Sequence, residues 1–279
     1  MPLALTLLAD VGYGLAWYRL GRLGHRWPAR RAACMLAGSL GAGIALLPPL
    51  ASHDDRFEVH VIQHLLLAMV APAFLALSAP VTLALRTLPR RVRRALLRVL
   101  HSPAVSVLTA PATVVTLDLG GLYLLYLTGL YQAAERDSVI HAAVHLHMFL
   151  AGCLLSWAII GIDPIRRRPG TRGRLAALFI AAAGHDTLAK LMYAWMLPAG
   201  GGPAADRRLG AELMYYGGTG IDVALAVIVM TQWYLAAGRA LARTRRRSAV
   251  RTVKPTSRWV RRSLRPNTSA PAHQCPAWG

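Results

Sequence analysis

Long apolar stretches alternate with short polar connections along most of the chain. A helix needs about 20 apolar residues to cross a hydrocarbon layer of roughly 30 Å, and windows of this length recur throughout the region before residue 239. They cover residues 2–18, 32–51, 58–79, 104–131, 139–162, 175–197 and 212–237. The pattern predicts an all-α integral membrane protein, folded as a bundle of seven transmembrane helices.

The composition agrees with a membrane location. Hydrophobic residues make up 55% of the 279 positions and charged residues only 16%, whereas soluble domains carry about 25% charged residues. A soluble chain of this length could not bury so much apolar surface in its core. The cysteines, three in number and far apart, exclude a scaffold built on disulfide bonds.

Basic residues lie in every second connection between the predicted spans. The first, third and fifth connections and the region after residue 238 hold 27 of the 32 lysines and arginines. Because such residues in short loops stay in the cytoplasm, we expect the N-terminus outside and the C-terminus in the cytoplasm. The same distribution argues against nucleic-acid binding as the origin of the net charge of +20, since a nucleic-acid-binding surface gathers its arginines on one folded face.

The character of the chain changes after the last predicted span. Residues 1–238 are expected to form the seven-helix membrane domain. Residues 239–279 are rich in Arg, Pro and Ser and poor in apolar residues, which predicts a disordered basic tail in the cytoplasm. Within the third connection, residues 90–100 place their apolar side chains on one helical stripe, so we expect a helix lying on the membrane surface.

Four histidines form two HxxxH pairs at corresponding places in two predicted spans. His60 and His64 lie in the first two turns of the third span, and His141 and His145 in the first two turns of the fifth. An i,i+4 spacing puts both rings of a pair on one helix face. Both spans enter from outside, so the pairs reach similar depths. We interpret these four histidines as a metal or haem site near the outer surface rather than as separate interfacial side chains.

Nearby methionines favour copper as the metal. Met148 continues the stripe of the second histidine pair, and Met192 and Met196 lie at the outer end of the sixth span. Imidazole and thioether ligands together suit copper, and thioether favours Cu(I). Because methionines at helix ends usually serve packing, we treat these three as possible supporting residues only.

Other ionisable residues lie within the spans, where they mark functional sites or paired groups. Asp118 and Asp222 have no charged partner close in sequence. They could orient a ligand histidine, relay protons or serve a structural role. We count both as possible supporting residues, together with His53 in the outer loop before the third span. His185 lies deeper in the sixth span than the two histidine pairs.

Four stretches of the chain match a known family pattern. They are residues 57–67 with the following Ala71, Pro72 and Pro80, then Trp27 and Pro28 with Arg30 and Arg31, residues 123–131 leading to the second histidine pair, and residues 215–218 with 232–234. In these features the chain resembles the CtaG family, the seven-helix cytochrome c oxidase assembly factors associated with caa-type oxidases. Thr219 departs from that pattern, because it stands where an acidic residue is expected.

The resemblance implies a function that the residues alone do not give. It implies a non-enzymatic assembly factor in a bacterial plasma membrane, with the lipid bilayer and cytochrome c oxidase subunits as partners, acting at the step that loads copper. From the residues, a membrane cytochrome with haem between the two histidine pairs and a copper permease stay open as alternatives. A permease would need ligands at several depths, whereas the predicted ligands lie in one layer.

Overall fold

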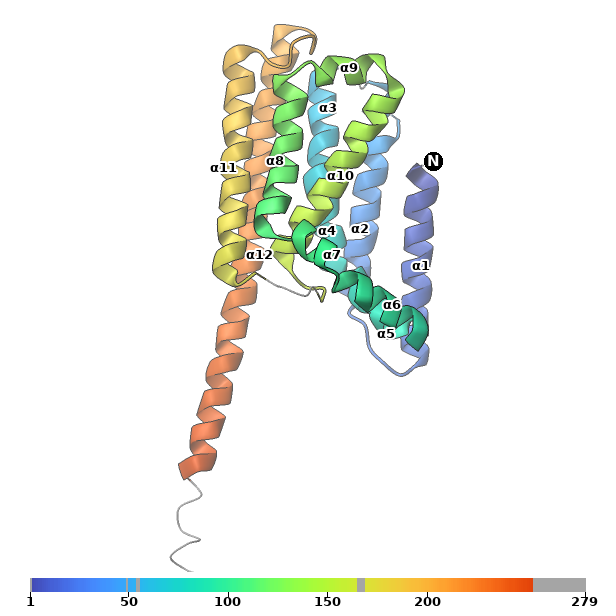
Figure 1. Ribbon diagram of the computed structural model, residues 1–279, viewed down its shortest axis with the longest axis vertical. Helices are drawn as coiled ribbons and strands as arrows, with labels where there is room; N and C mark the ends of the chain where they lie inside the picture. Colours follow the sequence, from blue (N-terminus) through green and yellow to red (C-terminus); the bar gives the residue numbers. More distant parts are fainter. Residues whose placement is uncertain (1, 49, 54–55, 165–168, 253–279) are drawn as a thin grey trace, which may run out of the picture. The chain divides into compact units, whose positions relative to one another are not determined.

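The computed structural model describes residues 2–48, 50–53, 56–164 and 169–252, and these ranges contain helices and connections but no strand. The chain divides into two units, Met1–Met230 and Thr231–Gly279. In chain order the helices are α1 (Pro2–Arg22), α2 (Ala29–Leu46), the 3₁₀ turn η1 (Leu50–Ser52), α3 (Phe57–His64), the π-helical segment η2 (Leu65–Val70), α4 (Ala71–Ser78), α5 (Pro80–Thr87), α6 (Arg90–Leu100), α7 (Pro103–Leu108), α8 (Pro111–Leu127), α9 (Leu130–Arg136), α10 (Ser138–Ile160), α11 (Thr171–Trp195) and α12 (Ala204–Thr252) (Figure 1).

Several helices are suited to a membrane. Four helical stretches are long and apolar enough to cross it, namely Phe57–Thr87, Ser138–Ile160, Thr171–Trp195 and Ala204–Arg245. Helices α8 and α9, bent by 76° relative to each other, add a fifth if they form one broken span. Helices α1 and α2 are not among these stretches; α1 contains Asp10 and ends with two arginines, and α2 has Arg30 and Arg31 in its first turn. The described part is therefore an all-helical, multi-pass protein with four or five candidate spans, and the seven-span topology stays a prediction.

Prolines mark the places where two predicted spans are interrupted. Residues 58–79 contain α3, the π-helical segment η2 and α4, whose second residue is Pro72. Proline has no N–H to donate to the carbonyl of Ala68, four residues earlier, and the wider π turn accommodates this loss. Residues 104–131, which we expected to form one helix, are divided among α7, α8 and the start of α9. Helix α8 begins at Pro111, a position in a helix that proline favours.

Helix α10 packs against η2 and α4 on one side and against α8 on another (Figure 1). The closest approach is at Gly152 of α10, where an added Cβ would come within 1.9 Å of the carbonyl oxygen of Ala68. No residue with a Cβ fits there without moving a backbone. This contact holds α10, which carries the second histidine pair, against the segment that directly follows the first pair.

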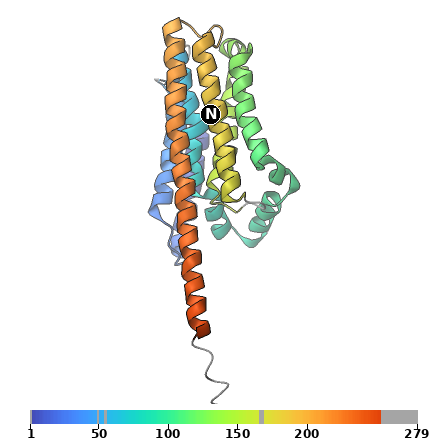
Figure 2. The ribbon, with the colours of Figure 1, turned by 90° about the vertical axis from the view of Figure 1, so that its left-hand side faces the viewer.

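The part of α12 that belongs to the first unit lies beside α11 in both ribbon views (Figures 1 and 2). The hydroxyl oxygen Oγ1 of Thr219 on α12 donates to Oδ1 of Asp186 on α11 at 3.1 Å. An added Cβ on Gly218 would come within 2.3 Å of Cε1 of His185. The small residue at position 218 therefore lets the ring of His185 lie directly against α12.

The region after the last predicted span is helical where the structure describes it. Helix α12 continues to Thr252, although we expected a disordered tail from residue 239 onward. Ala, Leu and Arg dominate residues 239–247, and all three favour a helix, so the helix continues beyond the apolar stretch. The rest of the expected tail, residues 253–279, lies outside the described residues.

The predicted surface helix forms over the expected residues. Helix α6 runs from Arg90 to Leu100, which is the range that the apolar stripe indicates. Its arginines are exposed, whereas Leu100 is buried. The helix prediction is confirmed, and the placement of α6 on a membrane surface stays a prediction.

Candidate metal centre

His60 and His145, one from each HxxxH pair, are buried neighbours in the interior of the first unit. The ring centroids of His60 and His145 are 5.8 Å apart. The two residues are 2% and 7% exposed. Helix α3 begins at Phe57 and α10 at Ser138. Each of the two histidines therefore lies within the first few turns of its helix. The structure thus joins the two predicted pairs through His60 and His145.

His141 adds a second ring from α10 to this pair. It stacks on His145 with a centroid distance of 4.3 Å, and it is only half-buried. Nδ1 of His145 lies 3.1 Å from the carbonyl oxygen of His141. Since a carbonyl accepts, Nδ1 carries the proton, and Nε2 of His145 then has the lone pair that a metal ligand needs. His141 is therefore the more accessible ring of the group.

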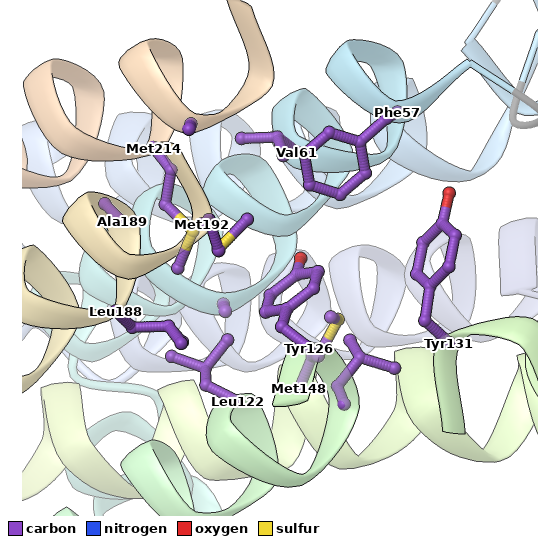
Figure 3. Close-up of a cluster of buried hydrophobic side chains, with 13 residues drawn as sticks. Phe57, Val61, Leu122, Tyr126, Tyr131, Met148, Leu188, Ala189, Met192 and Met214 are labelled. Atoms are coloured by element: carbon purple, nitrogen blue, oxygen red, sulfur yellow. The ribbon is translucent and has the colours of Figure 1, made fainter. Parts of the chain in front are cut away.

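Aromatic side chains surround His60. The ring of Tyr131 lies at a centroid distance of 5.2 Å and that of Tyr126 at 6.1 Å, both edge-on to the imidazole. Phe57 lies at 6.5 Å and is nearly parallel to it. All three belong to a buried hydrophobic cluster (Figure 3). Such surroundings keep water away from His60.

The supporting residues predicted near the outer end of the bundle do not all share one environment. Met148 and Met192 are buried in the same cluster as the aromatic rings, together with Met214 (Figure 3). Met196 follows the end of α11 and takes a left-handed backbone conformation with φ of 53°. His53 is exposed in the connection before α3. The structure therefore places two of the predicted methionines near the His60 surroundings and leaves Met196 and His53 in connections.

His64 lies beside His185 of α11. Their ring centroids are 5.9 Å apart and their planes differ by 19°. The two residues are 2% and 4% exposed. Four residues along a helix carry His64 about 6 Å below His60, and this brings it to the level of His185. Sequence reasoning placed His185 deeper than the pairs but did not include it in the site; its signal was an ionisable residue inside an apolar span.

The predicted supporting carboxylates lie at this second pair. A cavity of about 20 Å³ is lined by Asp118 and Asp222 together with His64, His185 and Met69. A larger, mostly apolar pocket of about 610 Å³, lined mainly by α8 and α10, shares His64 and Asp118 with that cavity. The two carboxylates therefore accompany the deeper pair of rings.

Each ring pair has dimensions that one metal ion could bridge. A metal–imidazole nitrogen bond is about 2.0–2.1 Å long, so two rings that share an ion have centroids at most about 6.5 Å apart. The observed distances of 5.8 and 5.9 Å meet this limit. Within the described residues, no group of three or more His, Cys, Asp or Glu side chains is arranged to hold a metal ion.

Comparisons with known proteins identify relatives of the chain. The family model described as cytochrome c oxidase caa3 assembly factor, Caa3_CtaG, matches residues 11–236. An uncharacterised protein of Mycobacterium leprae is 29% identical over 190 residues, which are 65% of this chain and 29% of that protein. Uncharacterised proteins of Mycobacterium bovis and Mycobacterium tuberculosis are each 30% identical over 195 residues, with the same shares. The match thus spans less than a third of the length of these relatives. No solved structure matches the chain.

The matched range includes both HxxxH pairs, His185 and the residues that line the small cavity. It extends from α1 into α12 and covers most of the chain. The resemblance predicted from the sequence is thereby confirmed. The chain belongs to the Caa3_CtaG family of cytochrome c oxidase caa3 assembly factors.

Proposed function

We propose that the protein is a non-enzymatic assembly factor that delivers copper to subunits of a caa3-type cytochrome c oxidase in a bacterial plasma membrane. The observation that carries this proposal is the buried His60–His145 pair, whose rings lie within the distance that one metal ion can bridge. The family description supports the oxidase as the recipient. The imidazole donors, with Met148 and Met192 buried in the neighbouring cluster, support Cu(I) as the cargo.

Binding and release of copper follow from the different exposures of the three rings. His141 is half-buried and serves as the first contact for an ion that arrives from outside. The ion then passes to Nε2 of His145 and to His60, where Tyr126, Tyr131 and Phe57 exclude water. Low coordination keeps the complex exchangeable, because a recipient site that offers more ligands can withdraw the ion.

The proposal includes a topology of seven spans with the N-terminus outside, so that the amino ends of α3 and α10 face the exterior. We expect a reporter that is active only outside the cell to be active when fused after Glu135. The same reporter fused after Gly170 is expected to be silent, because the arginines of that connection hold it in the cytoplasm. The opposite pattern would place the histidine pair on the cytoplasmic side and exclude delivery from outside.

Copper rescue of a ligand variant tests the proposed function. In a strain that lacks the protein, His145→Ala is expected to restore less than a tenth of the oxidase activity that the wild-type chain restores. Added copper is expected to raise this activity several-fold, since mass action offsets a weakened site. A failure of copper to raise it, with normal levels of the variant in the membrane, would indicate a scaffolding role instead.

A matched control comes from the same helix. His147 is exposed, and its Nε2 lies 3.1 Å from the carbonyl oxygen of Leu117 on α8. His147→Gln can keep this hydrogen bond and removes an imidazole that lies outside the two ring pairs. It is expected to restore full oxidase activity at any copper concentration. Absorbance of the purified wild-type protein checks the rival function, because a membrane cytochrome would show a strong Soret band and a Cu(I) protein would not.

A further inference from the structure

The small cavity beside His64 holds polar groups that the fold leaves without partners. His64 and His185 are each more than nine-tenths buried, and in the described part of the chain neither ring nitrogen of either residue has a hydrogen-bond partner. Oδ2 of Asp222 is likewise buried without one. Burying polar atoms in this way costs folding free energy unless something compensates them. The location of these atoms around one cavity indicates a shared ligand.

The size and shape of the cavity limit that ligand. A volume of about 20 Å³ accepts a single small species, since a water molecule already needs about 10–15 Å³. A hydrated divalent ion does not fit. The ring centroids of His64 and His185 are 5.9 Å apart and the rings are close to parallel, which permits one nitrogen of each ring to bind the same ion from opposite sides.

The donor atoms around the cavity favour Cu(I) over other ions. The imidazoles of His64 and His185 and the side chain of Met69 line it, and this combination of nitrogen and sulfur donors suits Cu(I). A cation in the membrane interior requires a compensating charge, and the carboxylate of Asp222 lies at the same cavity. Asp118 lines the cavity as well, so one ionised carboxylate of the two balances a univalent ion.

We propose that His64 and His185 form a second Cu(I) position, one helical turn deeper than the His60–His145 pair, with Met69 and Asp222 at its side. The identity of the ion rests on the proposed function, in which copper is the cargo. The two positions are consecutive along α3, because His60 and His64 lie on one face of the same helix. Copper bound at the outer pair can therefore move one turn inward without leaving the protein.

Counting Cu(I) equivalents in purified variants tests this proposal. The full chain in detergent is loaded with Cu(I) without oxygen, in competition with a chromophoric Cu(I) chelator. The wild-type protein and His147→Gln are expected to hold two equivalents. His185→Leu is expected to lose one equivalent and to keep or raise the thermal unfolding temperature of the metal-free protein, because an unpartnered imidazole is replaced by an apolar side chain.

A second substitution at position 185 distinguishes the loss of a copper ligand from a folding defect of His185→Leu. His185→Met retains a soft donor at the same position and is expected to restore the second equivalent. His145→Ala is expected to lose the outer equivalent and to keep the inner one. The proposal is supported when His185→Leu holds one equivalent and His185→Met holds two.

The outcomes separate this proposal from the proposed function. A wild-type protein with a single equivalent that His185→Leu abolishes and His145→Ala retains would support the deeper position and contradict the outer one. A single equivalent that only His145→Ala abolishes would overturn the deeper position and leave the proposed function standing. Two equivalents in His185→Leu would also overturn it, and no bound copper in the wild type would contradict both.

Discussion

Alanine at both His60 and His145 is expected to lower oxidase activity no further than alanine at either position alone. Each single variant is expected to restore less than a tenth of the wild-type activity in a strain that lacks the protein. The rings are 5.8 Å apart and share one ion in our proposal, so the first substitution already weakens binding of that ion enough that the second adds little without added copper. Residues that act as one unit show such non-additive effects. Oxidase activity in membranes, normalised to the amount of each variant, measures the effect.

A second double variant provides the comparison for this result. His145→Ala combined with His147→Gln is expected to behave as His145→Ala alone, because His147 lies outside the ring pairs and its replacement has no effect of its own. If the His60 and His145 effects instead multiply, the two histidines contribute independently. That result would contradict a shared ion at the outer pair.

Gly152→Ala is expected to disrupt the packing of the bundle. The new Cβ would come within 1.9 Å of the carbonyl oxygen of Ala68, and a backbone atom cannot turn aside as a side chain can. Overpacking costs typically about 1–3 kcal/mol and occasionally more, and we expect the upper part of this range here. The thermal unfolding midpoint in detergent should fall by several degrees, and the proposed outer Cu(I) position should weaken because α10, which carries His145, moves away from η2.

Gly43→Ala serves as the matched control for this substitution. Gly43 lies in α2, and an added Cβ there meets nothing within 4 Å. Glycine inside a helix is less favourable than alanine by about 0.5–1 kcal/mol, so this variant is expected to be as stable as the wild type or slightly more stable. Equal loss of stability in both variants would show that the contact with Ala68 does not limit the packing.

Part of the candidate site could be predicted from local sequence spacing. The HxxxH spacing fixes which face of a helix carries both rings, and the order of the spans fixes the end from which each helix enters. Those two facts place His60 and His145 at comparable depths, and the structure brings them together at 5.8 Å. Met148 was predicted near the second pair for the same reason, and it lies in the cluster around the aromatic neighbours of His60.

The rest of the arrangement depends on tertiary packing that local spacing does not determine. His64 lies beside His185 because α11 turns that residue toward α3 and because Gly218 leaves room for its ring. No periodicity within α11 specifies that rotation. Asp118 and Asp222 were predicted as supporting residues of the four histidines, and the structure places both at the deeper cavity, beside His64 and His185.

The helix boundaries, too, could be predicted only in part from the sequence. The apolar run over residues 104–131 predicts one helix, but Pro111 starts a new one and the chain bends by 76° between α8 and α9. Proline at the start of a helix and proline within a helix look alike in an apolar sequence. The π-helical segment before Pro72 is likewise a response to a missing donor that hydropathy alone does not reveal.

The copper content of the oxidase itself tests the central claim most directly. The caa3-type oxidase is isolated from strains that carry the wild-type chain, His147→Gln or the His60→Ala, His145→Ala double variant, and copper is measured per oxidase polypeptide. We predict full copper with the first two chains and a several-fold deficit with the double variant, while the oxidase polypeptides are still present in the membrane. Full copper in the oxidase from the double-variant strain would contradict copper delivery through this site.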